Sequence, residues 1–85
     1  MKVIITERAQ KDLGRLDKPT QKRVLRALDQ IASRPKATNL KKLEGHSNLL
    51  RLRVGDWRVI LRISREEVTI YALRVMNRRE AYRRL

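Results

Sequence analysis

Arginine side chains spaced to bind an anion are concentrated in one stretch, "LRLRVGDWRVILRIS" at residues 50–64. Apolar and polar residues alternate on both sides of Gly55 and Asp56, which predicts two strands joined by a two-residue turn. Glycine at the first turn position favours a type II′ turn, because it adopts a positive φ at little cost. We therefore expect Gly55 and Asp56 to form a hairpin tip with Arg53 directly opposite Arg58.

The predicted Arg53–Arg58 pair raises a question of charge. Like charges opposite each other on two antiparallel strands cost up to about 1 kcal/mol. One interpretation is that both side chains extend into water, which screens them. The other is that a bound phosphate reverses the sign of the interaction, since converging guanidinium groups stabilise negative charge. Several arginines on one face favour the anion site.

A second group of residues that can act on a nucleic acid lies at the end of the chain. Arg78 and Tyr82 are four residues apart in "NRREAYRRL", so they share one side of a helical turn. Tyrosine stacks on unpaired bases and donates a hydrogen bond, which suits single-stranded RNA. The alternative is that Tyr82 only packs against the sheet.

Other kinds of site have little support in the sequence. His46 is the only histidine, there is no cysteine, and no acidic cluster offers metal ligands. We therefore expect no metal and no cofactor. Trp57 belongs to the apolar side of its strand, which favours a role in the core over base stacking.

The charge balance predicts a polyanionic partner. The chain has 22 Lys and Arg against 9 Asp and Glu, a net charge of +13, and residues 51–85 hold ten Arg and no Lys. The arginine fork suits bidentate contact with phosphate and stacking on bases, although a solvated basic surface would show the same composition.

The first residues, "MKVIITERAQ", contain too few consecutive apolar residues for a signal peptide or a membrane span. We expect a cytoplasmic protein without a membrane contact.

The elements that must position these arginines can be predicted from periodicity. With 85 residues, we expect a single domain over residues 1–85. The fold class is α+β: a small antiparallel sheet in the order β-α-α-β-β-β, with a helical hairpin packed on it and a short C-terminal helical turn. We expect strands at residues 2–6, 50–54, 57–63 and 67–76, helices at about 7–16 and 18–34, and a connecting loop between the second helix and the hairpin. Thr6 and Pro19 suit the two helix starts, and the second helix is expected to bury Val24, Leu25, Leu28, Ile31 and Ala32.

The stretches "LEGHSNLLRLRVGDWRVILRI" and "YALRVMNRREAY" resemble the RelE/ParE superfamily of toxins from toxin–antitoxin pairs, and most of all its RelE branch. The resemblance spans nearly the whole chain. It implies a type II toxin that cuts translated mRNA in the ribosome by attack of a ribose 2′-OH on the adjacent phosphate, without a metal. It also implies an acidic, RelB-like antitoxin, the ribosome and mRNA as partners, and contact with operator DNA only through the antitoxin complex.

The site residues follow from that resemblance position by position. Arg53 and Arg58 correspond to phosphate-clamping residues, Arg78 to a group that stabilises transition-state charge or donates a proton, and Tyr82 to an aromatic that orients a base. Further RNA contacts are expected from Arg51, Arg62 and Arg79.

The chain departs from its relatives at the proton acceptor. Where some of them have lysine, histidine or glutamate, this chain has Arg51, Arg53 and Asn77, and arginine is a poor general base. Either orientation and charge stabilisation carry the catalysis, or Glu44 or His46 accepts the proton, or cleavage is slow. Two other functions stay open: a ParE-like poison that binds gyrase, and an RNA- or ribosome-binding module without chemistry.

Overall fold

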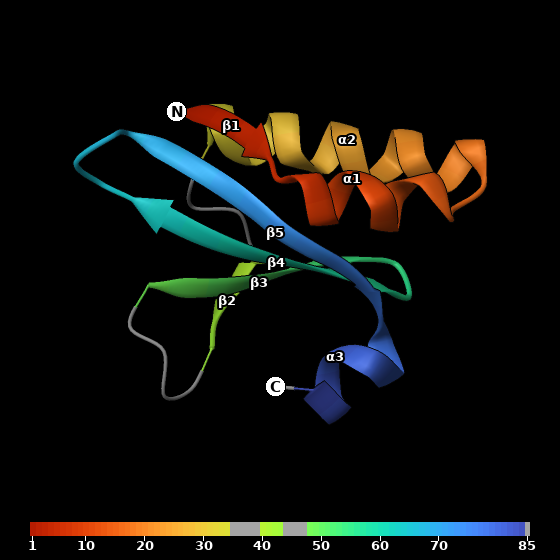
Figure 1. The fold of residues 1–85 in the computed structure, drawn as a ribbon. Helices are drawn as coiled ribbons and strands as arrows, with labels where there is room; N and C mark the ends of the chain where they lie inside the picture. The colour runs from red at the N-terminus through yellow and green to blue at the C-terminus, as the bar shows by residue number, and fades with distance from the viewer. Residues whose placement is uncertain (35–39, 44–47, 85) are drawn as a thin grey trace.

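A computed structural model describes residues 1–34, 40–43 and 48–84, with side chains as far as Ala81. Three helices and a five-stranded sheet form the described part of the chain (Figure 1). The elements in chain order are β1 (Lys2–Ile5), α1 (Glu7–Gly14), α2 (Lys18–Ser33), β2 (Leu40–Lys42), β3 (Leu49–Val54), β4 (Trp57–Ser64), β5 (Thr69–Asn77) and α3 (Arg78–Arg84). No helix among these residues has both the length and the apolar character needed to cross a membrane.

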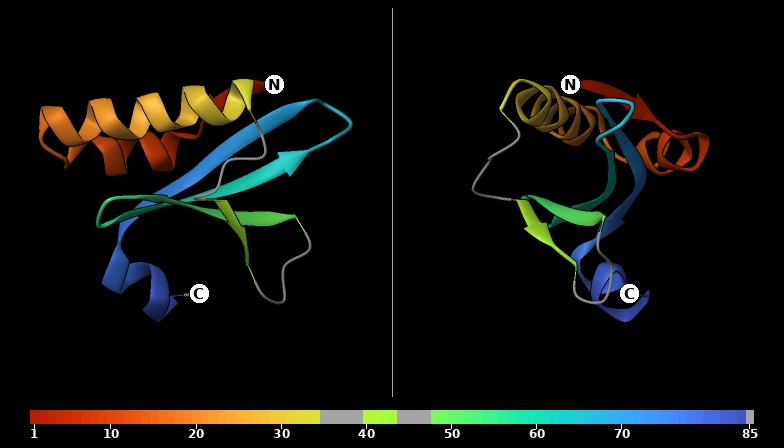
Figure 2. Two further views of the ribbon diagram at one scale, coloured as in Figure 1. Left: turned by 180° about the vertical axis from the view of Figure 1, so that it is seen from behind. Right: turned by 90° about the vertical axis from the view of Figure 1, so that its left-hand side faces the viewer.

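The sheet has the strand order β1-β5-β4-β3-β2. Helices α1 and α2 lie on one face and α3 lies on the other, as the two views of Figure 2 show. This arrangement confirms the predicted α+β class, the helical hairpin and the C-terminal helix. The apolar strand β5 lies between β1 and β4 and is covered on both faces, as its lack of polar alternation predicts.

The sheet differs from the expectation in two details. The stretch expected as a loop contains β2, which pairs antiparallel with β3 through Leu40 and Leu52. Three residues are too few for a period of two to be visible, so this edge strand is specified by its partner. The first strand, β1, pairs with β5 in parallel and not antiparallel.

The main core lies between the two helices and the sheet. It contains aliphatic side chains of α1, α2, β3, β4 and β5, among them Val24, Leu28, Ile31, Leu52, Val59, Leu61 and Ile70. Trp57 is half-buried and packs against this core, as predicted. Leu25, expected in the core, is 40% exposed. The buried stripe of α2 follows Val24, Leu28 and Ile31, and Leu25 is turned about 100° from Val24.

A smaller apolar cluster lies on the other face of the sheet, where Ile60 and Met76 pack with Ala81 of α3. A β-bulge determines which residues of β5 face each cluster. Ile60 pairs with Arg74 and Leu61 pairs with Ala72, so Leu73 is an extra residue without a partner in β4. As a result Val75 packs in the main core while Met76 packs under α3.

A buried carboxylate secures β5 beyond this bulge. The Asp12 side chain of α1 is 6% exposed, and its Oδ2 accepts hydrogen bonds from Arg74 Nε and from the backbone N–H of Val75, each at 2.9 Å. Burial opposes ionisation, but these two hydrogen bonds and the charges of Arg74 and Arg8 outweigh it, so the pKa of Asp12 lies below its ordinary value. Asp12 thereby fixes the part of β5 that leads into α3.

Candidate functional site: an arginine-lined hollow at the hairpin tip

The β3–β4 hairpin presents its arginines as the sequence predicts. Gly55 begins the turn with φ +60°, and Arg53 pairs with Arg58 across the two strands. The two side chains therefore leave the same face of the sheet, although their surroundings differ. Arg53 is exposed, whereas Arg58 is only 6% exposed.

The Arg58 guanidinium is held by the hairpin itself. Its Nη1 donates hydrogen bonds to the carbonyl oxygens of Gly55, at 2.9 Å, and Trp57, at 3.0 Å. A guanidinium carries five N–H groups, so these two bonds leave the three N–H groups of Nε and Nη2 without a partner in the described part of the chain. Arg58 is thus a cation held in a fixed position, with three N–H donors available to an anion.

Arg78 reaches the same place from the other end of the sequence. Its backbone N–H donates to the Asp56 carbonyl at 2.8 Å, which attaches the start of α3 to the hairpin tip. The preceding residue, Asn77, accepts a hydrogen bond from the Arg79 backbone N–H at 3.1 Å. Residues twenty or more positions apart in the chain therefore meet at the tip, because β5 ends beside it.

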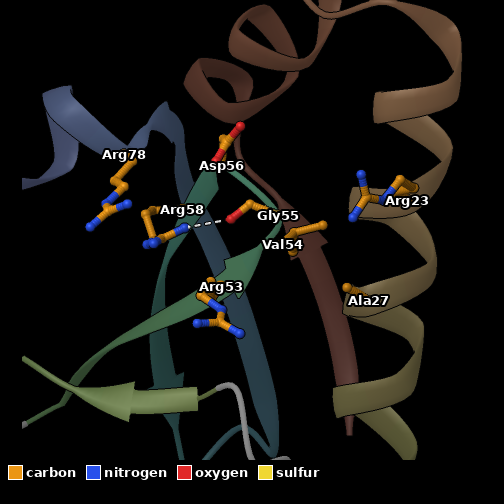
Figure 3. Close-up of a pocket in the computed structure, with 8 residues that line it drawn as sticks. All are labelled: Arg23, Ala27, Arg53, Val54, Gly55, Asp56, Arg58 and Arg78. Carbon is orange, nitrogen blue, oxygen red and sulfur yellow. Dashed lines mark hydrogen bonds between the residues drawn. The ribbon is translucent and has the colours of Figure 1, made fainter.

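Arg53, Arg58 and Arg78 line one open hollow of about 540 Å³, together with Arg23, Ala27, Val54, Gly55 and Asp56. Figure 3 shows Arg58 and Arg78 on one side of the tip, Arg23 on the other, and the Asp56 side chain directed away from Arg53 and Arg58. Among the described residues, no carboxylate lies within 4.0 Å of these four guanidinium groups. The hollow is therefore suited to an anion.

The other predicted RNA contacts lie outside this hollow. Arg51 lies on the same face as Arg53, opposite Lys41 on one side and Ile60 on the other. Arg62 is further along that face, with its guanidinium carbon 4.3 Å from the centre of the Tyr71 ring. Arg79 is exposed on α3. The Tyr82 side chain, Glu44 and His46 lie outside the described residues.

We call the sheet face that carries Arg51, Arg53, Arg58 and Arg62 the basic face. Two of its features were not predicted from the sequence. Lys41 joins it through β2, which was expected to be loop. Tyr71 donates from its hydroxyl to both carboxylate oxygens of Glu67, at 2.7 and 3.0 Å. This hydrogen bond raises the pKa of Tyr71 and lowers that of Glu67. Glu67 lies in a turn and Tyr71 in the following strand. Their four-residue spacing is therefore not that of a helix, and helical periodicity could not predict the contact.

Arg23 is the hollow-lining arginine that sequence reasoning missed. Helical periodicity places Arg23 off the buried stripe of α2 and predicts an outward-facing charge, and Arg23 is exposed. It nevertheless lies against the tip: a Cβ on Gly55 would be 3.1 Å from Arg23 Nη2. Helical periodicity separates buried from exposed positions, but it cannot show that a hairpin from 30 residues later ends beside one of the exposed ones.

Comparison with known proteins agrees with this fold and charge pattern. The family model for the ParE toxin of the type II toxin–antitoxin system parDE matches residues 3–82. The chain therefore belongs to the RelE/ParE superfamily and is a toxin of a type II toxin–antitoxin system. No curated protein matches the chain.

Similar solved structures come from archaea and bacteria. The archaeal RelE–RelB complex from Pyrococcus horikoshii OT3 is similar with 30% identity and a TM-score of 0.78, covering 91% of this chain and 93% of that one. The toxin–antitoxin complex RelBE2 from Mycobacterium tuberculosis has 28% identity and a TM-score of 0.79, covering 91% and 96%. The isolated E. coli RelE toxin, with 19% identity, a TM-score of 0.77 and coverage of 98% and 96%, shares the fold.

Proposed function

We propose that this toxin is a ribosome-dependent endoribonuclease that cuts translated mRNA. The observation that carries the proposal is the hollow in which Arg53, Arg58 and Arg78 meet without a carboxylate partner among the described residues. In the reaction, the ribose 2′ oxygen bonds to the adjacent phosphorus, its proton leaves, and the bond from phosphorus to the 5′ oxygen breaks as that oxygen gains a proton. Negative charge builds on the phosphoryl oxygens, where fixed cations stabilise it most.

The three arginines suit different parts of this step. Arg58 is pre-oriented by Gly55 and Trp57, so little reorganisation is needed when it contacts a phosphoryl oxygen. Arg53 approaches from the paired strand, and Arg78 from the start of α3. None of them is a good proton acceptor, since guanidinium stays protonated. The 2′-OH proton is accepted by Glu44 or His46, or catalysis depends on orientation and charge stabilisation without a dedicated base. Tyr82 is proposed to orient a base of the RNA.

The first prediction concerns cleavage by arginine variants. Arg78→Ala and Arg58→Gln should each reduce mRNA cutting by about 10²- to 10³-fold, the usual loss when one preorganised charge contact is removed. Glutamine is chosen at position 58 because it removes the charge and keeps a side-chain N–H donor at the tip, whereas alanine removes every donor and leaves the Gly55 and Trp57 carbonyls without their partner. Toe-printing on translating ribosomes measures the cuts.

Lys22→Ala is the control for this prediction, because Lys22 is exposed on α2 and does not line the hollow. It lowers the net charge equally and should cut normally. Equal losses in all three variants would mean general attraction to RNA and would contradict a localised site.

A second candidate is a poison that binds DNA gyrase, which the match to the ParE family model favours. The two candidates predict different products in treated cells. The proposed function gives cut mRNA, whereas the second gives gyrase-linked DNA breaks with intact mRNA. Toxicity with neither product would indicate a binding module without chemistry.

We also propose that an acidic, RelB-like antitoxin is the cognate partner. Relatives of known structure were solved as complexes of RelE with RelB, and the +13 charge of this chain suits an acidic segment that folds on binding. Operator DNA is expected to be contacted only through that complex.

A further inference from the structure

The hollow continues past the hairpin tip onto helix α2. Arg23 and Ala27 line it from α2, while Arg58 and Arg78 line it from the other side of the tip (Figure 3). Gly55 lies between the two sides and has no side chain to separate them. The Arg23 guanidinium approaches it so closely that a Cβ there would lie 3.1 Å from Nη2 and 3.4 Å from Nη1.

The charge of Arg23 has no partner on the described protein surface. No carboxylate of the described residues lies within 4.0 Å of it, and the other charged residues that line the hollow are Arg53, Arg58, Arg78 and a single acid, Asp56, whose side chain is directed away from Arg53 and Arg58. Four guanidinium charges around one hollow repel one another, one carboxylate offsets only part of that repulsion, and a bound anion would offset the rest. Arg23 is exposed and could extend away from the others, yet its guanidinium lies against the tip.

The size of the hollow indicates what kind of anion fits. Its volume of about 540 Å³ is in the range of sites that hold drug-sized ligands, about 300–1,000 Å³, and exceeds what a single phosphate group fills. A single-stranded RNA supplies several phosphates in a row, and a strand that leaves Arg58 and Arg78 over the bare Gly55 backbone arrives at Arg23.

We infer that Arg23 binds the phosphate next to the one held by Arg58 and Arg78, so that the RNA strand crosses the hairpin tip over Gly55. This inference rests on the proposed function, because it extends the phosphate site assigned there. Arg23 acts in it as a binding residue that fixes the path of the strand, and it takes no part in the bond-breaking step.

The second prediction tests Arg23 by the salt dependence of RNA binding. Binding of the purified toxin to a short fluorescein-labelled single-stranded RNA is measured by anisotropy over a range of NaCl concentrations. Each phosphate contact contributes about 0.7 to the slope of log affinity against log salt for a single strand. Arg23→Gln should therefore lower that slope by about 0.7 and weaken binding by about threefold or more at low salt.

Arg26→Gln is the matched control, because Arg26 is an exposed arginine of the same helix that does not line the hollow. It should leave the slope close to that of the unchanged protein. Equal slopes for the two variants would overturn the inference about Arg23, and so would a loss of antitoxin binding by Arg23→Gln with an unchanged RNA slope.

The same set of proteins separates this inference from the proposed function. If Arg58→Gln loses mRNA cutting while Arg23→Gln behaves as Arg26→Gln, the cleavage site stands and the extended strand path fails. If Arg23→Gln lowers the slope although the unchanged toxin cuts no mRNA on ribosomes, the strand path stands and the proposed reaction fails.

Discussion

At the scale of single residues, the sequence predicts the position of Arg58 in the hairpin but not the surroundings of its side chain. Alternation and the Gly55-Asp56 turn are enough to place it opposite Arg53 on the same face. Its burial and its bonds to Gly55 and Trp57 depend on how the guanidinium folds back over the tip. That rotamer choice leaves no trace in residue type or spacing.

The third prediction concerns the backbone at Val68. This residue is 56% exposed and has φ +52°, a left-handed conformation that costs a β-branched residue about 1–2 kcal/mol. Asparagine tolerates it better, so Val68→Asn should raise the free energy of unfolding by about 1 kcal/mol. Urea unfolding monitored by Trp57 fluorescence measures the change. Val68→Thr keeps the branched Cβ and should leave the midpoint nearly unchanged, and a matching gain there would rule out relief of strain.

At the scale of elements, the sequence was sufficient for the helical hairpin, the arginine hairpin and the terminal helix. Local signals specify the two hairpins: the Thr6 cap, which accepts from the Ala9 N–H at 3.3 Å, Pro19 in the first turn of α2, and the glycine turn. The parallel pairing of β1 with β5 and the edge strand β2 are long-range choices. They depend on which edge of the sheet is still unpaired when the strand is added, and no short sequence pattern carries that information.

The fourth prediction concerns the link between α1 and β5 through Asp12. Its pKa is lowered in the folded protein from an ordinary value of 3.8. Asp12 therefore stabilises the fold fully above that value, and this contribution is lost as the pH falls through the lower folded pKa. Asp12→Asn should reduce the free energy of unfolding at neutral pH by about 1–3 kcal/mol and flatten its decrease below about pH 4.

Asp29→Asn is the control for this experiment, because Asp29 is exposed on α2 and forms no ion pair with a described residue. Thermal unfolding of both variants across acidic and neutral pH gives the comparison. A pH dependence of Asp12→Asn as steep as that of the unchanged protein would show that other carboxylates control acid unfolding.

At the scale of the whole molecule, a net charge of +13 has to be reconciled with a small fold. Register places five cations on the sheet face that α1 and α2 leave uncovered: Lys41, Arg51, Arg53, Arg58 and Arg62. Composition indicated a polyanionic partner, alternation placed several arginines on one face, and the observed register adds Lys41 to that face. Self-repulsion of this kind is relieved when an anionic partner binds.

The fifth prediction follows for the antitoxin. The acidic antitoxin proposed as the partner should bind this toxin, raise its thermal midpoint with the logarithm of antitoxin concentration, and compete with RNA. Because opposite charges drive the encounter, the association rate should fall as salt rises. Stopped-flow mixing at low and high NaCl measures the rate. An association rate that does not change with salt would mean that the basic face does not steer the encounter with the antitoxin.

The unpaired Leu73 in β5 also bears on how relatives should be aligned with this chain. Because it is one residue more than β4 accommodates, every position that follows is offset by one relative to strict alternation. An alignment that closes a gap at Leu73 would exchange the assignments of Val75 and Met76 and move the start of α3 by one residue. Comparisons of the terminal arginines across the superfamily are therefore best made in a frame fixed by the Asp12 contact with the Val75 backbone, and not by counting from the hairpin.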